Sequence, residues 1–405
     1  MAAGALPLAS SAPASRGSDR RARFVELLLA GGSTFFLFPL AWLLRRSFGL
    51  DASEYAFGFM TFYGAYVIND PHFAVTYLLF YKDVRGRALD PAVDRAQRIR
   101  YVVAGFVVPA ALVAWAIVAI TSHSAQALGW MIQLMFLLVG WHYVKQGFGA
   151  FTVLSARRGE RVTPRERAVL LAHCYAGWAF AWANPATVAG MFEEKGIVYW
   201  TPAHPRALEL MTGAALALST IALVAVLVAK WIRERRMLPI GPLSVMLVTV
   251  WSWSIYSSVD PLMRYVIPAL HSIQYLFFVA LMKRNEARAN EGPPSFGRPV
   301  AVRLGALAIT AVGLGWILFR GAPTFLDGML VPHARHGSAP DALGETPYFA
   351  ALFVLVNIHH YFMDSVIWRR ENPETRWLTA TSPPGEHSSG VDGDTCTCRG
   401  RHLDV

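Results

Sequence analysis

Residues 126–158 read QALGWMIQLMFLLVGWHYVKQGFGAFTVLSARR, an almost uncharged stretch that ends in two arginines. At about 1.5 Å of rise per residue, a helix of this length is sufficient to cross a hydrocarbon core roughly 30 Å thick. The same pattern, an apolar run bounded by basic residues, recurs along the chain. These runs predict an all-α polytopic membrane protein.

The composition of the 405-residue chain agrees with this interpretation. Hydrophobic residues make up 54% of it and charged residues only 16%, whereas soluble domains carry roughly a quarter charged residues. This excludes an ordinary soluble enzyme. The net charge of +10 does not indicate a nucleic-acid partner, because the lysines and arginines gather between the apolar runs. The three cysteines are too few for a disulfide framework.

We expect about ten transmembrane helices in one bundle. They are predicted at 24–45, 56–81, 101–121, 126–155, 168–189, 207–230, 238–258, 262–282, 300–320 and 346–368. The connecting segments alternate between basic and poor in lysine and arginine, which predicts an inner-membrane protein with both termini in the cytoplasm. The chain then divides into a disordered N-terminal segment (1–23), a ten-span domain (24–370) and a disordered C-terminal tail (371–405).

Histidines lie deep inside four of these expected spans, where an ionisable side chain is costly unless it faces protein, a partner or a ligand. They are His72, His142, His271 and the adjacent pair His359 and His360. Counted along each helix to the basic residue at its cytoplasmic end, one histidine of each span lies about 14 to 22 Å from the cytoplasmic boundary. Taken alone, each suits a hydrogen bond between helices. Together, at one depth, they predict a shared metal site.

Polar residues accompany these histidines. Asp364 and Gln146 each follow a candidate histidine by four residues and so share its helix face. Either could fix the ring by a hydrogen bond or bind the metal itself. Asp70 precedes Pro71, which should break its helix, and is expected to be a ligand, a proton relay or a paired counter-charge. The candidate catalytic residues are therefore Asp364, Asp70 and Gln146.

The sequence His-His-Tyr-Phe-Met-Asp at 359–364 and the spacing of His142 and Gln146 resemble the histidine boxes of integral-membrane non-haem iron enzymes, the fatty-acid desaturase and hydroxylase group. There is a looser similarity to the membrane carotene-cleaving dioxygenases. The resemblance implies a non-haem iron oxidoreductase that acts on a lipid or another hydrophobic substrate, with an electron-donor protein at the cytoplasmic face. No expected span holds two histidines three or four residues apart, which favours a single ion over a di-iron centre.

Other interpretations stay open. A transporter or proton-coupled permease would use the layer of histidines and aspartates as a path across the membrane. A haem protein would use two of the histidines as axial ligands of the iron. Zinc also accepts imidazole ligands. The expected cofactor is therefore iron first, with zinc or haem as alternatives.

Overall fold

The computed structural model describes residues 16–183, 189–235, 237–258, 260, 262–293, 295–331 and 343–380. Within these ranges the protein is helical apart from one antiparallel hairpin, formed by β1 (Gly190–Glu194) and β2 (Ile197–Thr201). The long helices are α8 (Ala125–Arg157), α9 (Pro164–Trp182), α10 (Arg206–Glu234), α12 (Met263–Ala289), α13 (Val300–Trp316) and α15 (Pro347–Ile367). The shorter ones are α1 (Arg16–Leu27), α2 (Thr34–Phe48), α3 (Leu50–Gly64), α4 (Asp70–Tyr81), α5 (Val84–Leu89), α6 (Arg95–Val102), α7 (Val108–Thr121), α11 (Ile240–Leu247) and α14 (Ala322–Leu330).

Several apolar helices of the described residues are compatible with a membrane protein. Seven are long and apolar enough to cross a membrane: Arg95–Thr121, Ala125–Arg157, Arg206–Glu234, Ile240–Ser258, Tyr265–Ala289, Val300–Leu330 and Pro347–Ile367. The pair Arg20–Gly32 and Thr34–Phe48, bent by 55°, would make an eighth. The expected count of ten is therefore not confirmed.

The two other expected spans are helical but carry polar residues. The first covers α3, a π-helical turn η2 (Ala65–Asn69) and α4, and contains the sequence Asn-Asp-Pro-His at 69–72. The second is represented by α9, which begins four residues earlier than expected and has charged residues at 165–167 in its first turn, while residues 184–188 of that span lie outside the described residues. The expected break at Pro71 is not seen, since Asn69 and Asp70 keep helical backbone angles and the π-helical turn η2 runs directly into α4. Wide turns of this kind are frequent at functional sites.

The segments expected to be disordered at the two ends of the chain are helical in part. Helix α1 starts at Arg16, and its Glu26 lies 3.8 Å from Arg157 at the end of α8 and 3.3 Å from Arg158, the next residue. These ion pairs hold α1 against the bundle. In the tail, a short 3₁₀ helix, η7 (Pro373–Leu378), packs against α12. Residues 1–15 and 381–405 of these segments lie outside the described residues.

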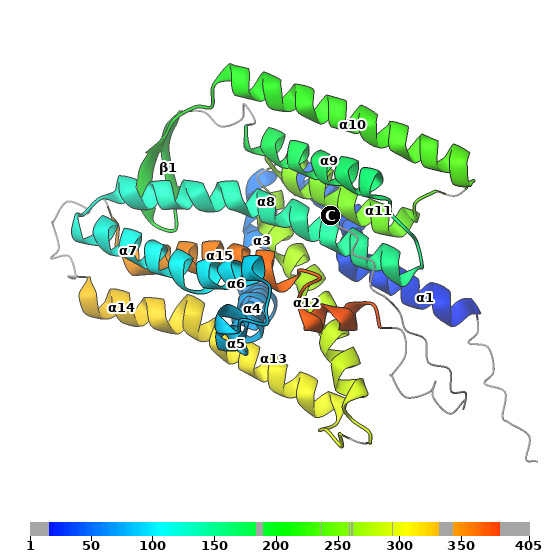
Figure 1. Ribbon diagram of the computed structural model, residues 1–405. Coiled ribbons are helices and arrows are strands. Elements are labelled where there is room, and N and C mark those ends of the chain that lie inside the picture. The colour runs from blue at the N-terminus through cyan, green and yellow to red at the C-terminus, as the bar shows by residue number, and fades with distance from the viewer. Residues whose placement is uncertain are drawn as a thin grey trace, which may run out of the picture.

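Helix α15 is the central element of the bundle, and α10 is peripheral. The window of α15 that could span the membrane is 72% buried, against 11% for α10. Figure 1 shows α10 at one edge, lying on α9, while α13 and α14 form the opposite edge. Helix α15 packs against α4, α8 and α14. Side chains of α15 that face α4 and α8 therefore meet the side chains of these helices in the interior of the bundle.

Candidate metal centre

Four histidines, one from each of four helices, meet in the core. His72 lies on α4, His142 on α8, His271 on α12 and His360 on α15. Each of the four side chains is buried, with at most 4% of the residue exposed. One ring nitrogen from each lies within 4.8 Å of the others. The structure thus brings together the histidines that share a depth in the sequence.

The spacing of these nitrogens fits a single metal ion. The Nε2 atoms of His142 and His271 are 3.1 Å apart. Two nitrogens bound to one ion at about 2.0–2.2 Å are at most about 4.4 Å apart, so a small contraction would bring all four within bonding distance. Nε2 of His72 and both ring nitrogens of His360 are buried without a hydrogen-bond partner. Because unpartnered buried nitrogens are costly, the group could hold a metal ion.

Asp364 lies beside this four-histidine group. Its Oδ2 atom is 3.4 Å from Nε2 of His360 and 3.6 Å from Nε2 of His142. Its other oxygen, Oδ1, accepts a hydrogen bond of 3.0 Å from the hydroxyl of Tyr275, which lies 2.7 Å from the hydroxyl of Thr76. The carboxylate is therefore held between two imidazoles and a pair of hydroxyl groups. From this position it could bind the metal or accept a hydrogen bond from a ligand of the metal.

The sequence interpretation did not assign Tyr275 and Thr76 to the site. Each follows a candidate histidine of its own helix by four residues, Tyr275 after His271 and Thr76 after His72. This spacing puts both hydroxyl groups on the face that carries the histidine. The spacing test that selected Asp364 and Gln146 also pairs Tyr275 with His271 in the sequence, without giving it a role, and the same test would have found Thr76 beside His72.

Gln146 supports the backbone of His271. Its Nε2 atom donates a hydrogen bond of 3.2 Å to the carbonyl of His271 and one of 2.8 Å to Oε1 of Gln274. Gln274 in turn donates to the carbonyl of Ala30, beside the bend between α1 and α2. At that bend Gly31 has a φ of +122°, which residues with a side chain rarely adopt. The amide chain thus ties α8 and α12 to the N-terminal helices.

Asp70 lies outside the four-histidine group and forms an ion pair. Its Oδ2 atom is 3.8 Å from Nε of Arg320. The guanidinium of Arg320 also lies over the rings of Phe62 and Tyr66, at 5.0 and 4.6 Å from their centroids. Of the three roles considered for Asp70, this arrangement corresponds to the paired counter-charge.

His359 is directed away from the four-histidine group, which does not include it. Its Nδ1 atom lies 3.0 Å from the hydroxyl of Tyr77, and its Nε2 atom lies 3.0 Å from the carbonyl of Ala104. Ala104 belongs to a π-helical turn, η3 (Val103–Val107), between α6 and α7. Successive residues of a helix point about 100° apart, so His359 contacts a neighbouring helix while His360 faces the group. These contacts do not support the expectation that His359 is a metal ligand.

Replacing His359 with alanine should leave metal binding intact and lower the free energy of unfolding by about 1–3 kcal/mol, because a buried hydroxyl and a carbonyl lose their partner. Thermal unfolding and metal content of the detergent-purified variant measure the two effects. A variant that loses metal with unchanged stability would place His359 at the centre instead.

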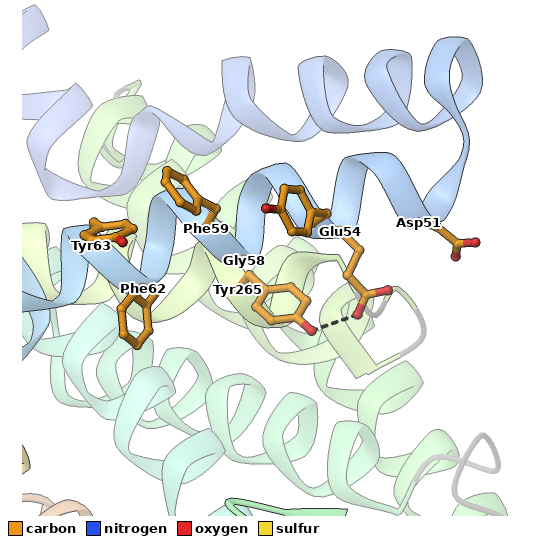
Figure 2. A pocket seen from close by; sticks show the side chains of 8 residues that line it. Asp51, Glu54, Gly58, Phe59, Phe62, Tyr63 and Tyr265 are labelled. Atoms are coloured by element: carbon orange, nitrogen blue, oxygen red, sulfur yellow. Dashed lines mark hydrogen bonds between the residues drawn. The ribbon is translucent and has the colours of Figure 1, made fainter.

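A groove of about 570 Å³ lies along α3, as Figure 2 shows. Its walls are acidic at one end, with Asp51 and Glu54, and aromatic along the rest, with Phe59, Phe62, Tyr63 and Tyr265. Tyr265 of α12 donates a hydrogen bond of 2.7 Å to Glu54. None of the lining residues belongs to the four-histidine group, so this groove is separate from the candidate metal centre.

The chain matches no protein-family model, no curated protein and no solved structure. The class of protein is therefore described from the fold and the candidate site alone. It is an α-helical protein, compatible with insertion in a membrane, whose core contains a buried group of four histidines that could hold a metal ion.

Proposed function

We propose that this protein is an integral-membrane metalloenzyme that oxidises a lipid or another hydrophobic substrate. A single non-haem iron ion would be held by His72, His142, His271 and His360. The proposal is carried by one observation: four buried imidazoles from four helices place a nitrogen each within 4.8 Å of one another. Imidazole ligands suit iron, copper and zinc, and iron is the metal of this set best suited to oxidation of an unreactive chain by dioxygen.

Asp364 is the proposed catalytic carboxylate. It is the acidic side chain that lies within 3.6 Å of two of the proposed ligands, so it can take a fifth position on the ion or accept a proton from a ligand there. Gln146 would keep the His271 backbone in place. Asp70, paired with Arg320, would fix the start of α4 two residues before His72.

The surroundings of the group support a hydrophobic substrate. Many large hydrophobic side chains of the described residues are exposed on the outside of the bundle, which is compatible with a substrate dissolved in the bilayer. Dioxygen would be the oxidant. Where one of its oxygen atoms leaves as water, two further electrons are needed, and we propose that a donor protein supplies them at the cytoplasmic face of the inner membrane.

The geometry favours a bare ion over haem. Neighbouring imidazole centroids in the group are 4.5–4.9 Å apart. A porphyrin between two axial histidines would occupy the space that the other two rings fill. A transporter is the second candidate, because the Asp70–Arg320 ion pair lies at the junction of the π-helical turn η2 and α4, and ionisable side chains inside a bundle of membrane helices are typical of transport paths.

Elemental analysis and an absorption spectrum of the detergent-purified protein test the proposal. We expect close to one iron ion per chain and no Soret band. A metal-free protein would support the transporter, a Soret band would support haem, and stoichiometric zinc would contradict the proposed oxidation.

Lipid extracts test the reaction itself. Membranes from cells that express the wild-type protein should contain a product that is richer in oxygen, or poorer by two hydrogens, than its precursor, as measured by mass spectrometry. Cells that express an inactive variant with alanine at His142 and His360 provide the control. Identical extracts from the two, with iron bound to the wild type, would refute the oxidase assignment while leaving the metal site in place.

A further inference from the structure

A second cavity, of about 680 Å³, lies at the end of the bundle where α8 ends and α11 begins, with α1 along its side. Three arginines line it: Arg23 of α1, Arg157 of α8, and Arg158 directly after α8. None of its lining residues belongs to the four-histidine group. The cavity is therefore independent of the proposed enzymatic function.

Glu26 organises the arginines of this cavity. Its Oε1 atom is 3.3 Å from Nη2 of Arg158, and its Oε2 atom is 3.8 Å from Nε of Arg157. One carboxylate thus holds two guanidinium groups side by side. Glu160 is the other acidic residue of the lining, so three arginines face two carboxylates and one positive charge is left for a ligand. Planar guanidinium groups arranged together bind phosphate oxygens in pairs.

The start of α11 adds further donors to the same cavity. Pro239 and Gly241 line it, and the cap of this helix makes no side-chain hydrogen bond. The backbone N–H groups of a first helical turn have no partner within the helix and carry a partial positive charge, which favours an anion. Gly241 lies against Arg158, since a Cβ at this position would come within 2.8 Å of its Nη1 atom. Glycine therefore lets the helix start and the guanidinium share one space.

Apolar side chains complete the lining. Phe24 and Leu27 of α1 belong to it, and 53% of Phe24 is exposed. A phospholipid carries the two kinds of group that this lining would accept. Its phosphate would lie at the arginines and the start of α11, and its acyl chains would lie beside Phe24 and Leu27. Basic pockets between membrane helices on the cytoplasmic side are suited to such head groups.

We propose that this cavity binds a phosphate group through Arg23, Arg157 and Arg158, and that the phosphate is that of an anionic phospholipid. Phe24 and Leu27 contact its acyl chains. Lipid bound here joins α1, α8 and α11 at one point.

Binding can be measured on the full-length protein in a non-ionic detergent, by native mass spectrometry and by the shift in melting temperature. Three probes separate the sources of phosphate: phosphatidylglycerol, phosphatidylcholine and inorganic phosphate. We expect phosphatidylglycerol to remain bound and to raise the melting temperature more than the other two. If inorganic phosphate equals it, the phosphate site stands and the lipid assignment falls.

Two variants test the residues. The double variant R157Q/R158Q should bind phosphatidylglycerol at least about tenfold more weakly, as expected for the loss of two charge-assisted contacts. R23Q changes an exposed residue of α1 and should weaken binding without the risk of breaking the Glu26 ion pairs. R95Q/R165Q removes two exposed arginines outside the cavity and serves as the charge-matched control. Equal binding of phosphatidylglycerol by the wild type, R23Q and R157Q/R158Q would overturn the proposal. A loss of the same size in every variant, including the R95Q/R165Q control, would show a general effect of charge and would overturn it too. Iron content should be unchanged throughout, which separates this test from that of the oxidase.

Discussion

Alanine at both His142 and His360 should remove bound metal from the purified protein. A four-ligand metal site contributes about 10–16 kcal/mol of binding free energy in small metal-binding peptides, so each ligand accounts for about 2.5–4 kcal/mol. Losing one ligand should then weaken metal binding about 100- to 1000-fold, and losing two should leave the protein essentially metal-free after purification. Metal content per chain, measured by elemental analysis, gives the result directly.

His173 provides a matched control for this experiment. It is fully buried, like the ligands, but its Nδ1 atom lies 3.2 Å from the hydroxyl of Ser219 and it lies outside the four-histidine group. His173→Ala should therefore retain the metal. Full metal content in the double variant would show that the four imidazoles do not bind the ion. Equal losses in the variant and the control would point to misfolding instead.

Asparagine in place of Asp364 should abolish the proposed oxidation and weaken metal binding about 10- to 100-fold, the usual range for residues that support metal ligands. The substitution keeps the shape of the side chain and its hydrogen bond with Tyr275, but removes the negative charge that lies within 3.6 Å of His142 and His360. Metal titration and product analysis of the same preparation measure the two losses.

Tyr275→Phe separates the charge of Asp364 from its position. This variant keeps the carboxylate and deletes the hydroxyl group that donates to it. We expect a smaller decrease in metal affinity than in the asparagine variant, together with measurable product. If the asparagine variant retained full activity and full metal affinity, Asp364 would have no part in the chemistry.

The meeting of the four histidines could be predicted from the sequence, whereas the direction of each ring could not. Helical rise fixes how far His72, His142, His271 and His360 lie from the ends of their spans. Rotation about the helix axis depends on packing against other helices. The sequence therefore left open which of His359 and His360 enters the site, and the π-helical turn that receives His359 is a tertiary feature.

Partners from distant parts of the chain were also beyond the sequence. Asp70 pairs with Arg320, which lies 250 residues further along the chain, and no local spacing connects them. The expected count of ten spans is not confirmed for a related reason. Helical periodicity and apolar runs locate helices, but the α3–α4 segment contains Asp70 and His72, which are buried among neighbouring helices. Helix α9 begins with the charged residues 165–167.

The positions of the four histidines along the chain determine when the site can exist. His72 is made early in translation, and His360 enters only with α15, the last long helix of the described residues. A nascent chain that has inserted everything before α15 therefore presents three imidazoles and no Asp364. The complete proposed metal site can therefore form only after α15 has been made, and a chain cut short before residue 347 lacks both His360 and Asp364.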